Sequence, residues 1–460
     1  MRPGDHHRTS PPSRLQLVAL LLLPACALSA RAGGSRWEVT KTHDLGRAWA
    51  GHPVGFAFAI RGDREYVGWY DADRRMTFAQ RKLGSDEWTV HRTNEVTGWD
   101  SHNRIALAFD RGDHLHVAAN MHCSRLRYWR SKKPEDVTSL RPVHRMTGHE
   151  NGCTYPRFLH DKEGGLLFLF RIGGSGRGRR YVNVYDEETR TWSRLLKKPL
   201  LSGREGKTSM NAYPIGLRTD AAGVVHLAWV WRNTPDCSTN HDLCYARSKD
   251  FKTWTTSSGE TLDLPITLEN AEVVDPVPVK GGLANFGGGL AFDQEGRPMI
   301  TYIKFDKAGK TQVYAARLED GKWARRQVTE WDYRWFFRGG GSIRSEISWS
   351  ALRLAGNALV FSYRHTKLGP GRYRQRFDPK TLEPIGEPVV VTSPWPAEVR
   401  KARSDFPDMR VHLRGRRPGG AEGKRRIHLL RWETLPQNRD RPRKKFPPPG
   451  KLQLIELERK

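Results

Sequence analysis

A short phrase recurs along the chain and restricts the folds open to it. An aspartate is followed, two or three residues later, by a turn glycine and then by an alternating apolar run. The phrase begins at Asp110, Asp161, Asp220 and Asp293. Asp-x-x-Gly suits a hairpin turn, and the runs that follow are rich in strand-forming residues. No extended segment has a helical period, so the sequence predicts an all-β chain of repeated units.

A second phrase follows most of these runs and consists of a polar turn that ends in tryptophan. The stretch with Ser248, Asp250 and Trp254 is similar to the Asp-box turn of sialidase-type propellers. Strand-rich units of about 50 residues, repeated about seven times, are typical of a β-propeller. We therefore predict a seven-bladed β-propeller of four-stranded antiparallel blades, with the Asp-x-x-Gly phrase at the start of each innermost strand. A long β-helix is the alternative.

The beginning of the chain has the features of a secretory signal peptide. Arg8 and Arg14 precede an apolar run over residues 15–23, which is too short to cross a bilayer comfortably. Small residues around Ala30 and Ala32 suit a cleavage site. We therefore expect a secreted or periplasmic protein without a membrane span. A lipoprotein anchor is less favoured, because Pro24 fits the lipoprotein cleavage box poorly.

These features predict three parts of the chain. Residues 1–32 are the expected signal peptide, residues 35–435 the propeller, and residues 436–460 a basic tail. The whole chain has 78 Lys and Arg against 50 Asp and Glu, a formal net charge of +28. A field of that sign attracts polyanions. Export favours an anionic polysaccharide over nucleic acid as the partner, and we expect a monomer.

Four cysteines remain once the signal peptide is set aside. In an oxidising compartment an even number suggests two disulfides, whose pairing the sequence leaves open. Cys237, His241 and Cys244 have a compact spacing that could instead hold a structural zinc, with a fourth ligand from elsewhere. Both interpretations remain open at this point.

Four polar residues stand at the ends of apolar runs and have related chemistry. They are His102, His122, Tyr155 and Arg171. Histidine and tyrosine can remove or supply a proton next to a carboxylate, and the planar arginine fork can neutralise that carboxylate. Each residue also has a structural explanation, such as a turn histidine or a tyrosine before proline. Their order along the chain, rather than any one of them, suggests a site.

Other residues are candidates for binding a sugar chain. They combine cationic, amide or imidazole groups with neighbouring aromatic residues or strand ends. An equally good explanation for several is packing between blades. The candidate substrate-binding residues are Arg157, Asn240, His241, Arg334, Arg338, Arg364 and His365.

Several longer motifs resemble a known family. They are Asp100-Ser-His-Asn103, Asn120-Met-His-Cys123, Thr154-Tyr-Pro-Arg-Phe158 and Asn240-His-Asp-Leu-Cys244. Over roughly residues 50–415 the sequence is similar to the BNR-repeat propellers that include bacterial ulvan lyases. That resemblance implies a seven-bladed fold and places the catalytic residues of the family on His102, His122, Tyr155 and Arg171.

The resemblance further implies β-elimination at a 4-linked uronic acid in an ulvan-like polysaccharide. Arg171 would neutralise the carboxylate, and His122 would assist it. His102 and Tyr155 would share the roles of base and acid, in a division that the sequence leaves open. The chemistry requires no cofactor. A non-catalytic carbohydrate-binding propeller and a sialidase-like glycoside hydrolase are the alternatives.

Overall fold

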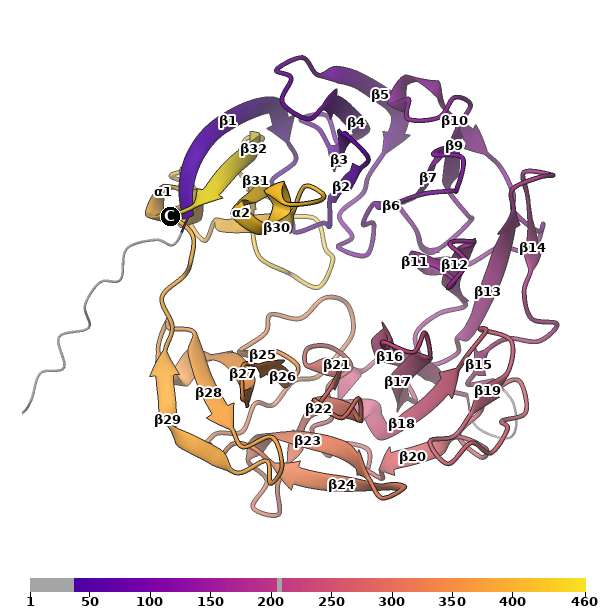
Figure 1. Cartoon of the computed structure of the whole chain (residues 1–460), viewed down its shortest axis with the longest axis vertical. Coiled ribbons are helices and arrows are strands. Elements are labelled where there is room, and N and C mark those ends of the chain that lie inside the picture. Colours follow the sequence, from indigo (N-terminus) through magenta and orange to yellow (C-terminus); the bar gives the residue numbers. More distant parts are fainter. Residues whose placement is uncertain (1–36, 205–208) are drawn as a thin grey trace, which may run out of the picture. The chain divides into compact units, whose positions relative to one another are not determined.

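The computed structural model describes residues 37–204 and 209–460 and consists almost entirely of β-strands. Seven antiparallel sheets follow one another around a ring, each built on four strands (Figure 1). The predicted seven-bladed propeller is therefore confirmed. The predicted signal peptide, residues 1–32, lies outside the described residues. Among the residues described, no helix is long and apolar enough to span a membrane.

The first three blades follow the chain directly. Blade 1 contains β2 (Ala57–Arg61), β3 (Arg64–Tyr70), β4 (Arg75–Lys82) and β5 (Thr89–Val96). Blade 2 contains β6 (Ala106–Phe109), β7 (Leu115–Ala118), β9 (Tyr128–Ser131) and β10 (Leu140–Val143). Blade 3 contains β11 (Cys153–His160), β12 (Leu166–Ile172), β13 (Arg179–Asp186) and β14 (Thr191–Arg194), with β8 (His122–Ser124) and β15 (Leu201–Ser202) attached.

Blades 4 to 6 continue in the same order. Blade 4 contains β16 (Asn211–Thr219), β17 (Val225–Arg232), β18 (Asn240–Ser248), β19 (Trp254–Thr255) and the added β20 (Glu272–Asp275). Blade 5 contains β21 (Gly289–Phe292), β22 (Pro298–Phe305), β23 (Thr311–Glu319) and β24 (Lys322–Gln327). Blade 6 contains β25 (Ile347–Trp349), β27 (Ala358–His365), β28 (Tyr373–Phe377), β29 (Pro384–Val390) and the added β26 (Arg353–Ala355).

Blade 7 joins the two ends of the propeller. It contains β30 (Arg410–Arg416), β31 (Arg426–Thr434), β32 (Gly450–Arg459) and β1 (Trp37–Ala48). The short helices α1 (Ala397–Arg400) and α2 (Glu422–Arg425) precede β30 and β31. Residues 436–460 were expected to form a tail, but β32 lies at the centre of this sheet between β1 and β31. Its alternating apolar residues, such as Leu452 and Leu454, are fully buried.

The recurring aspartates hold the turns that join the first and second strands of a blade. In each of the four copies, Oδ1 of the aspartate accepts a hydrogen bond from the backbone N–H four residues later. Gly164, Gly223 and Gly296 take the positive φ that these turns require. The phrase therefore follows the innermost strand of the blade, whereas the sequence analysis placed it before that strand.

Two of these aspartates also tie the turn to the next strands through buried histidines. His116 Nε2 lies 3.1 Å from Asp110 Oδ2, and its Nδ1 lies 2.8 Å from the Tyr128 hydroxyl. In blade 4, His226 makes the same two contacts, to Asp220 at 3.1 Å and to Tyr245 at 2.6 Å. Burial lowers the pKa of both histidines, although the aspartates oppose this.

Stability should therefore fall as the pH decreases. Below about pH 6.5 the unfolded chain protonates its histidines, whereas the folded chain keeps His116 and His226 neutral to a lower pH. The unfolded state then binds more protons, so the free energy of unfolding decreases with pH. Thermal unfolding followed from pH 8 to pH 5 measures this. A His116→Gln/His226→Gln variant should lose part of the pH dependence, whereas His144→Gln on the surface should not. A constant midpoint over this range would contradict the prediction.

Candidate functional site

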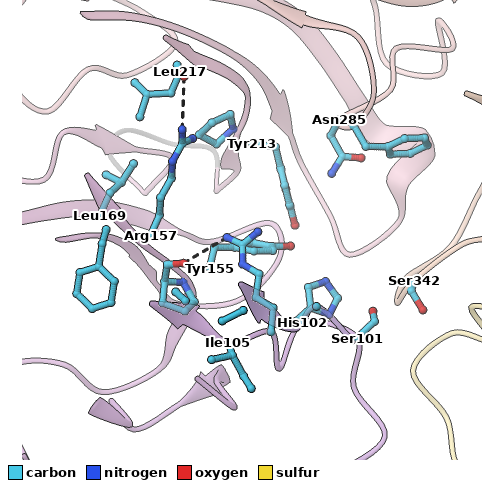
Figure 2. A pocket seen from close by; sticks show the side chains of 18 of the residues that line it. Ser101, His102, Ile105, Tyr155, Arg157, Leu169, Tyr213, Leu217, Asn285 and Ser342 are labelled. Carbon is cyan, nitrogen blue, oxygen red and sulfur yellow. Dashed lines mark hydrogen bonds between the residues drawn. The ribbon is translucent and has the colours of Figure 1, made fainter. Parts of the chain in front are cut away.

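A cavity of about 900 Å³ lies among the inner strands and their connecting loops (Figure 2). Its wall includes residues from β2, β6, β11, β16 and β30, and from the loop before β25. Ser101 and His102 lie at one side, with Ser342 beside Ser101, and Tyr155 and Tyr213 extend toward the same space. The cavity therefore collects residues that are far apart in the sequence.

Asp100 holds two histidines in one stacked pair. Its Oδ1 lies 2.6 Å from Nδ1 of His102, and its Oδ2 contacts Nδ1 of His122. The two imidazole rings lie 4.1 Å apart and nearly parallel. Burial opposes ionisation of Asp100, but the hydrogen bonds from both histidines hold its pKa far below the usual range. An ionised carboxylate only accepts hydrogen bonds, so both histidines carry their proton on Nδ1 and leave Nε2 as an acceptor.

A second carboxylate reaches this pair from the far end of the chain. Asp440 accepts hydrogen bonds from the backbone and hydroxyl of Ser101 and of Ser342. Its Oδ2 also lies 3.5 Å from Nδ1 of His102. Asp440 thus joins the loop before β6, the loop before β25 and the segment before β32. Asp100, His102 and His122 lie close enough together to hold a metal ion. Their direct hydrogen bonds to one another already account for their positions.

Tyr155 is placed by a bulge in β11. The pairing of β11 with β12 shifts between Thr154 and Arg157, and Tyr155 has a φ of 59°. A non-glycine residue in this region costs about 1–3 kcal/mol, and such strain concentrates at functional sites. The bulge brings the Tyr155 ring to 5.5 Å from the His102 ring and 6.2 Å from the Tyr213 ring.

The two tyrosines lie among guanidinium groups. Arg171 and Arg180 lie 4.8 Å and 5.5 Å from the Tyr155 ring, and Arg232 lies 5.2 Å from the Tyr213 ring. Burial and the neighbouring Tyr213 raise the pKa of Tyr155, against the effect of the arginines. Burial would also raise the pKa of Tyr213, but Arg232, Arg171 and the hydrogen bond with Ser175 together lower it. Tyr155 therefore holds its hydroxyl proton more firmly, whereas Tyr213 is the stronger acid of the two.

The cavity is strongly basic. No aspartate or glutamate of the described chain lines it, so its charge is not neutralised within the wall. Arg180 is 5% exposed, and burial together with Arg171 lowers its pKa to about 9. The arginines that line the cavity are Arg104, Arg157, Arg180, Arg232, Arg414 and Arg416.

The structure brings together only some of the predicted site residues. His102, Tyr155 and Arg157 line the cavity, and His122 stacks beside His102. Arg171 does not line it. Its side chain is buried beneath Tyr155, where Nη2 donates to the Thr154 hydroxyl at 3.2 Å, while Nε and Nη1 have no hydrogen-bond partner among the described residues.

The remaining predicted binding residues lie outside the cavity wall. Asn240 reaches it indirectly, because its amide donates to Asn285 Oδ1, and Asn285 lines the cavity. His241 hydrogen-bonds Asn233 and Asp242. The others are held elsewhere: Arg334 over Phe305, Arg338 beside Phe336, His365 against Trp331 and Tyr333, and Arg364 on the surface of blade 6.

The expected zinc or disulfide at Cys237, His241 and Cys244 is not formed. All four described cysteines are free thiols, and these three residues do not meet as a ligand group within the described chain. Cys237 packs with Trp335 and Phe337, whereas Cys244 belongs to a different apolar cluster in blade 4. Burial raises the pKa of both thiols, which opposes the thiolate that zinc requires. Cys237 and Cys244 are close in the sequence but not in the structure, because their side chains pack into different apolar clusters.

Sequence analysis missed several residues of the site. Asp100 was quoted only within a motif that resembles the family, and Tyr213 was not singled out. Arg104, Arg180 and Arg232 carry no local signal, because arginine is abundant throughout the chain. The register of β12 with β13 places Arg171 directly opposite Arg180. Like charges in that position are unfavourable, and a correct strand alignment would have exposed this pair.

The chain was compared with known proteins. Residues 64–331, more than half of the sequence, match the family described as BNR repeat-containing family members. The chain belongs to this family. A long-isoform ulvan lyase from Glaciecola sp. (strain KUL10) is 48% identical over 69 residues, which are 15% of this chain and 7% of that relative. A short-isoform ulvan lyase from Alteromonas sp. (strain LOR) is 33% identical over 89 residues, 19% of this chain and 16% of the relative.

The matched segments thus cover less than a fifth of these curated relatives, whereas solved structures match across most of the chain. The polysaccharide lyase Uly1 superposes with a TM-score of 0.61 at 15% identity, covering 92% of this chain and 99% of Uly1. A PL25 ulvan lyase gives a TM-score of 0.58 at 13% identity, covering 89% and 94% of the two chains. At such identities the likeness establishes the propeller fold.

The Asp100 contacts predict the tautomers of both histidines. We expect the imidazole nitrogens of neutral His102 and His122 to show Nδ1–H and unprotonated Nε2 in nitrogen-15 spectra. In Asp100→Asn the amide has a single acceptor oxygen, so at least one ring should change its tautomer or orientation. His160, which hydrogen-bonds a backbone carbonyl through Nε2 at 2.8 Å, provides an internal Nε2–H reference. An Nε2–H signal from His102 in the unmodified protein would contradict the assignment.

Proposed function

We propose that this protein is a secreted polysaccharide lyase that cleaves a uronic-acid-containing, ulvan-like polysaccharide by β-elimination. The observation that carries the proposal is the meeting of Tyr155 and His102 in a cavity lined by arginines and by no carboxylate. An ulvan lyase of the same fold has been solved with a GlcA(1-4)Rha3S repeat bound. Its substrate class agrees with the charge of the cavity described above.

His102 suits the role of general base. Elimination removes the hydrogen at C5, next to the carboxylate, and expels the oxygen at C4. Because Asp100 accepts the Nδ1 proton of His102, Nε2 keeps the lone pair that takes the C5 proton. Asp100 also stabilises the imidazolium that forms when the proton arrives. His122, held by the same carboxylate, supports the orientation of the His102 ring.

Tyr155 suits the role of general acid. Its raised pKa keeps the hydroxyl protonated at neutral pH, so it can donate to the departing O4. The electron pair of the C5–H bond forms the C4–C5 double bond, and the C4–O4 bond breaks with protonation of O4 by Tyr155. The product is an unsaturated uronate and a new sugar end. No cofactor takes part in this scheme.

Charge on the substrate carboxylate grows during proton removal, and an arginine must neutralise it. Arg180 lines the cavity, whereas Arg171 lies beneath Tyr155. Among the residues described, no acidic group pairs with Arg180, whose Nε donates to the backbone of Ala212 at 3.2 Å. We assign the carboxylate contact to Arg180, and the support of Tyr155 to Arg171.

The cavity chemistry argues against the hydrolase alternative. Most glycoside hydrolases, including those of sialidase type, need a carboxylic acid close to the scissile bond. No such side chain lines the cavity within the described residues. A non-catalytic binding propeller would use the same basic wall but would not need Tyr155 beside His102. Incubation with ulvan and with polygalacturonate, followed by ultraviolet absorbance of the unsaturated uronate, separates binding from cleavage.

Removing the Tyr155 hydroxyl should abolish most of the activity. Tyr155→Phe keeps the ring packed under Arg171 and edge-on to Tyr213 but removes the proton donor, so kcat should fall about 10²–10⁴-fold. Initial rates on ulvan and the thermal unfolding midpoint are the measurements. Tyr181→Phe is the matched control, because Tyr181 contacts Phe170 and Arg194 and does not line the cavity. If Tyr155→Phe cleaves ulvan at nearly the parental rate, Tyr155 is not the general acid.

The carboxylate contact gives a separate expectation. Arg180→Lys keeps a positive charge but loses the planar two-donor fork, so kcat/KM should fall at least about tenfold. The loss should appear with uronate substrates of any length, since every cleavage site presents one carboxylate. Arg190→Lys, on the exposed turn before β14, is the control. If Arg180→Lys cleaves at the parental rate while Arg171→Lys does not, the contact belongs to Arg171.

A further inference from the structure

The junction between blades 6 and 7 differs from the other junctions of the described propeller. Buried apolar clusters join every other pair of neighbouring blades, including blade 7 to blade 1. Blade 6 shares its cluster with blade 5. Blade 7 instead covers its own apolar side with Trp395 and Val399, from around α1. One face of blade 6 is therefore left without an apolar partner.

Strand alternation identifies the residues on that face. Leu359 and Phe361 of β27 are fully buried toward blade 5. Side chains on a strand alternate between its two faces. Val360, Ser362 and Arg364 therefore point away from blade 5, into the open junction.

The open face is rich in arginine. Val360 pairs with Arg353 of β26 and with Arg376 of β28, and Ser362 pairs with Arg374. Paired residues share a face, so these side chains surround Val360 and Ser362. We call this set the blade 6 arginine face. Its members, all exposed, are Arg353, Arg364, Arg372, Arg374 and Arg376.

The charge of this face is not neutralised. None of its arginines forms an ion pair with an acidic residue in the described part of the chain. Partial burial, followed by repulsion from Arg364, Arg374 and Arg353, lowers the pKa of Arg372, in agreement with the close spacing that strand pairing gives these arginines. Ile385 and Val389 of β29 lie opposite Arg376 and Arg374 and are 41% and 59% exposed. The face thus combines fixed cations with aliphatic surface.

Charge decides what can occupy the blade 6 arginine face. The segment before β1 has five arginines, at positions 2, 8, 14, 31 and 36, against Asp5 as its acidic residue, so it would be repelled. A second copy of a chain with net charge +28 would be repelled as well. We propose that this face binds an anionic polysaccharide at a second site, apart from the cavity. None of its arginines lines the cavity. The proposal goes beyond cleavage and holds whether or not the bound chain is cut.

A second site would change how the protein binds a long polymer. A chain held at the blade 6 arginine face raises the local concentration of its remaining length near the cavity. Short fragments cannot span both sites, so they gain nothing from it. Long and short substrates should therefore respond differently to changes at this face.

The test compares two triple variants in the Tyr155→Phe background, which prevents cleavage during binding. Arg353→Ala/Arg374→Ala/Arg376→Ala removes part of the face. Arg145→Ala/Arg190→Ala/Arg326→Ala removes equal charge from exposed positions elsewhere. Affinity for immobilised polymeric ulvan and for dextran sulfate should fall about tenfold in the first variant and less than about twofold in the second. Affinity for an ulvan tetrasaccharide should be equal in both, and so should the thermal unfolding midpoint.

Three results would overturn the proposal. Equal loss of polymer affinity in both variants would mean that net charge alone attracts the polymer. Loss of tetrasaccharide affinity in the face variant would mean that the face is part of the cavity site. A dimer of the parent that the face variant abolishes would mean that a second copy covers this surface. Selective loss of dextran sulfate binding, in a protein that cleaves no ulvan, would support the second site while removing the proposed lyase activity.

Discussion

The pairing of β1 with β32 is the contact on which the rest of the molecule depends. It places the first and last described strands side by side in blade 7, in antiparallel register from Trp37 opposite Arg459 to Ala48 opposite Gly450. A buried ionic network supports the same region, because Arg81 contacts Glu65 at 2.6 Å and Glu456 at 2.6 Å. Both Arg81 and Glu65 are inaccessible to solvent, so loss of either partner would leave a costly buried charge. The ring closes there, and the same blade supplies Arg414 and Arg416 to the cavity wall.

Closure also explains why the site is assembled from distant parts of the chain. His102 comes from the loop before β6, Tyr155 from the bulge in β11, and Arg414 from β30. Several blades contribute side chains to the wall, and no blade supplies the whole of it. The blade 6 arginine face has the opposite character, since adjacent strands of a single sheet supply all its cations. The cavity therefore depends on the arrangement of several blades around the ring, whereas the blade 6 arginine face depends on one sheet.

Much of the fold could be predicted from the sequence, because its signals are local. An aspartate that caps a turn and a run of strand-forming residues are properties of a few neighbouring residues, as at Asp220 and Val225–Arg232. His102, His122 and Tyr155 were found through motifs of the same short range. Arg180, Asp440 and the burial of Arg171 escaped prediction because they depend on strand register and ring closure. The zinc hypothesis was wrong for a related reason, since Cys237 and Cys244 turn into different clusters.

Asp440 is synthesised after the other residues of the cavity that it holds in place. It lies in the segment before the last strand, and its carboxylate holds Ser101, Ser342 and, at 3.5 Å, His102. During synthesis from the N-terminus, every other element of the cavity is made before this anchor is. The arrangement of the cavity is then the last part of it to be fixed, and an incomplete chain has the residues of the cavity without their arrangement.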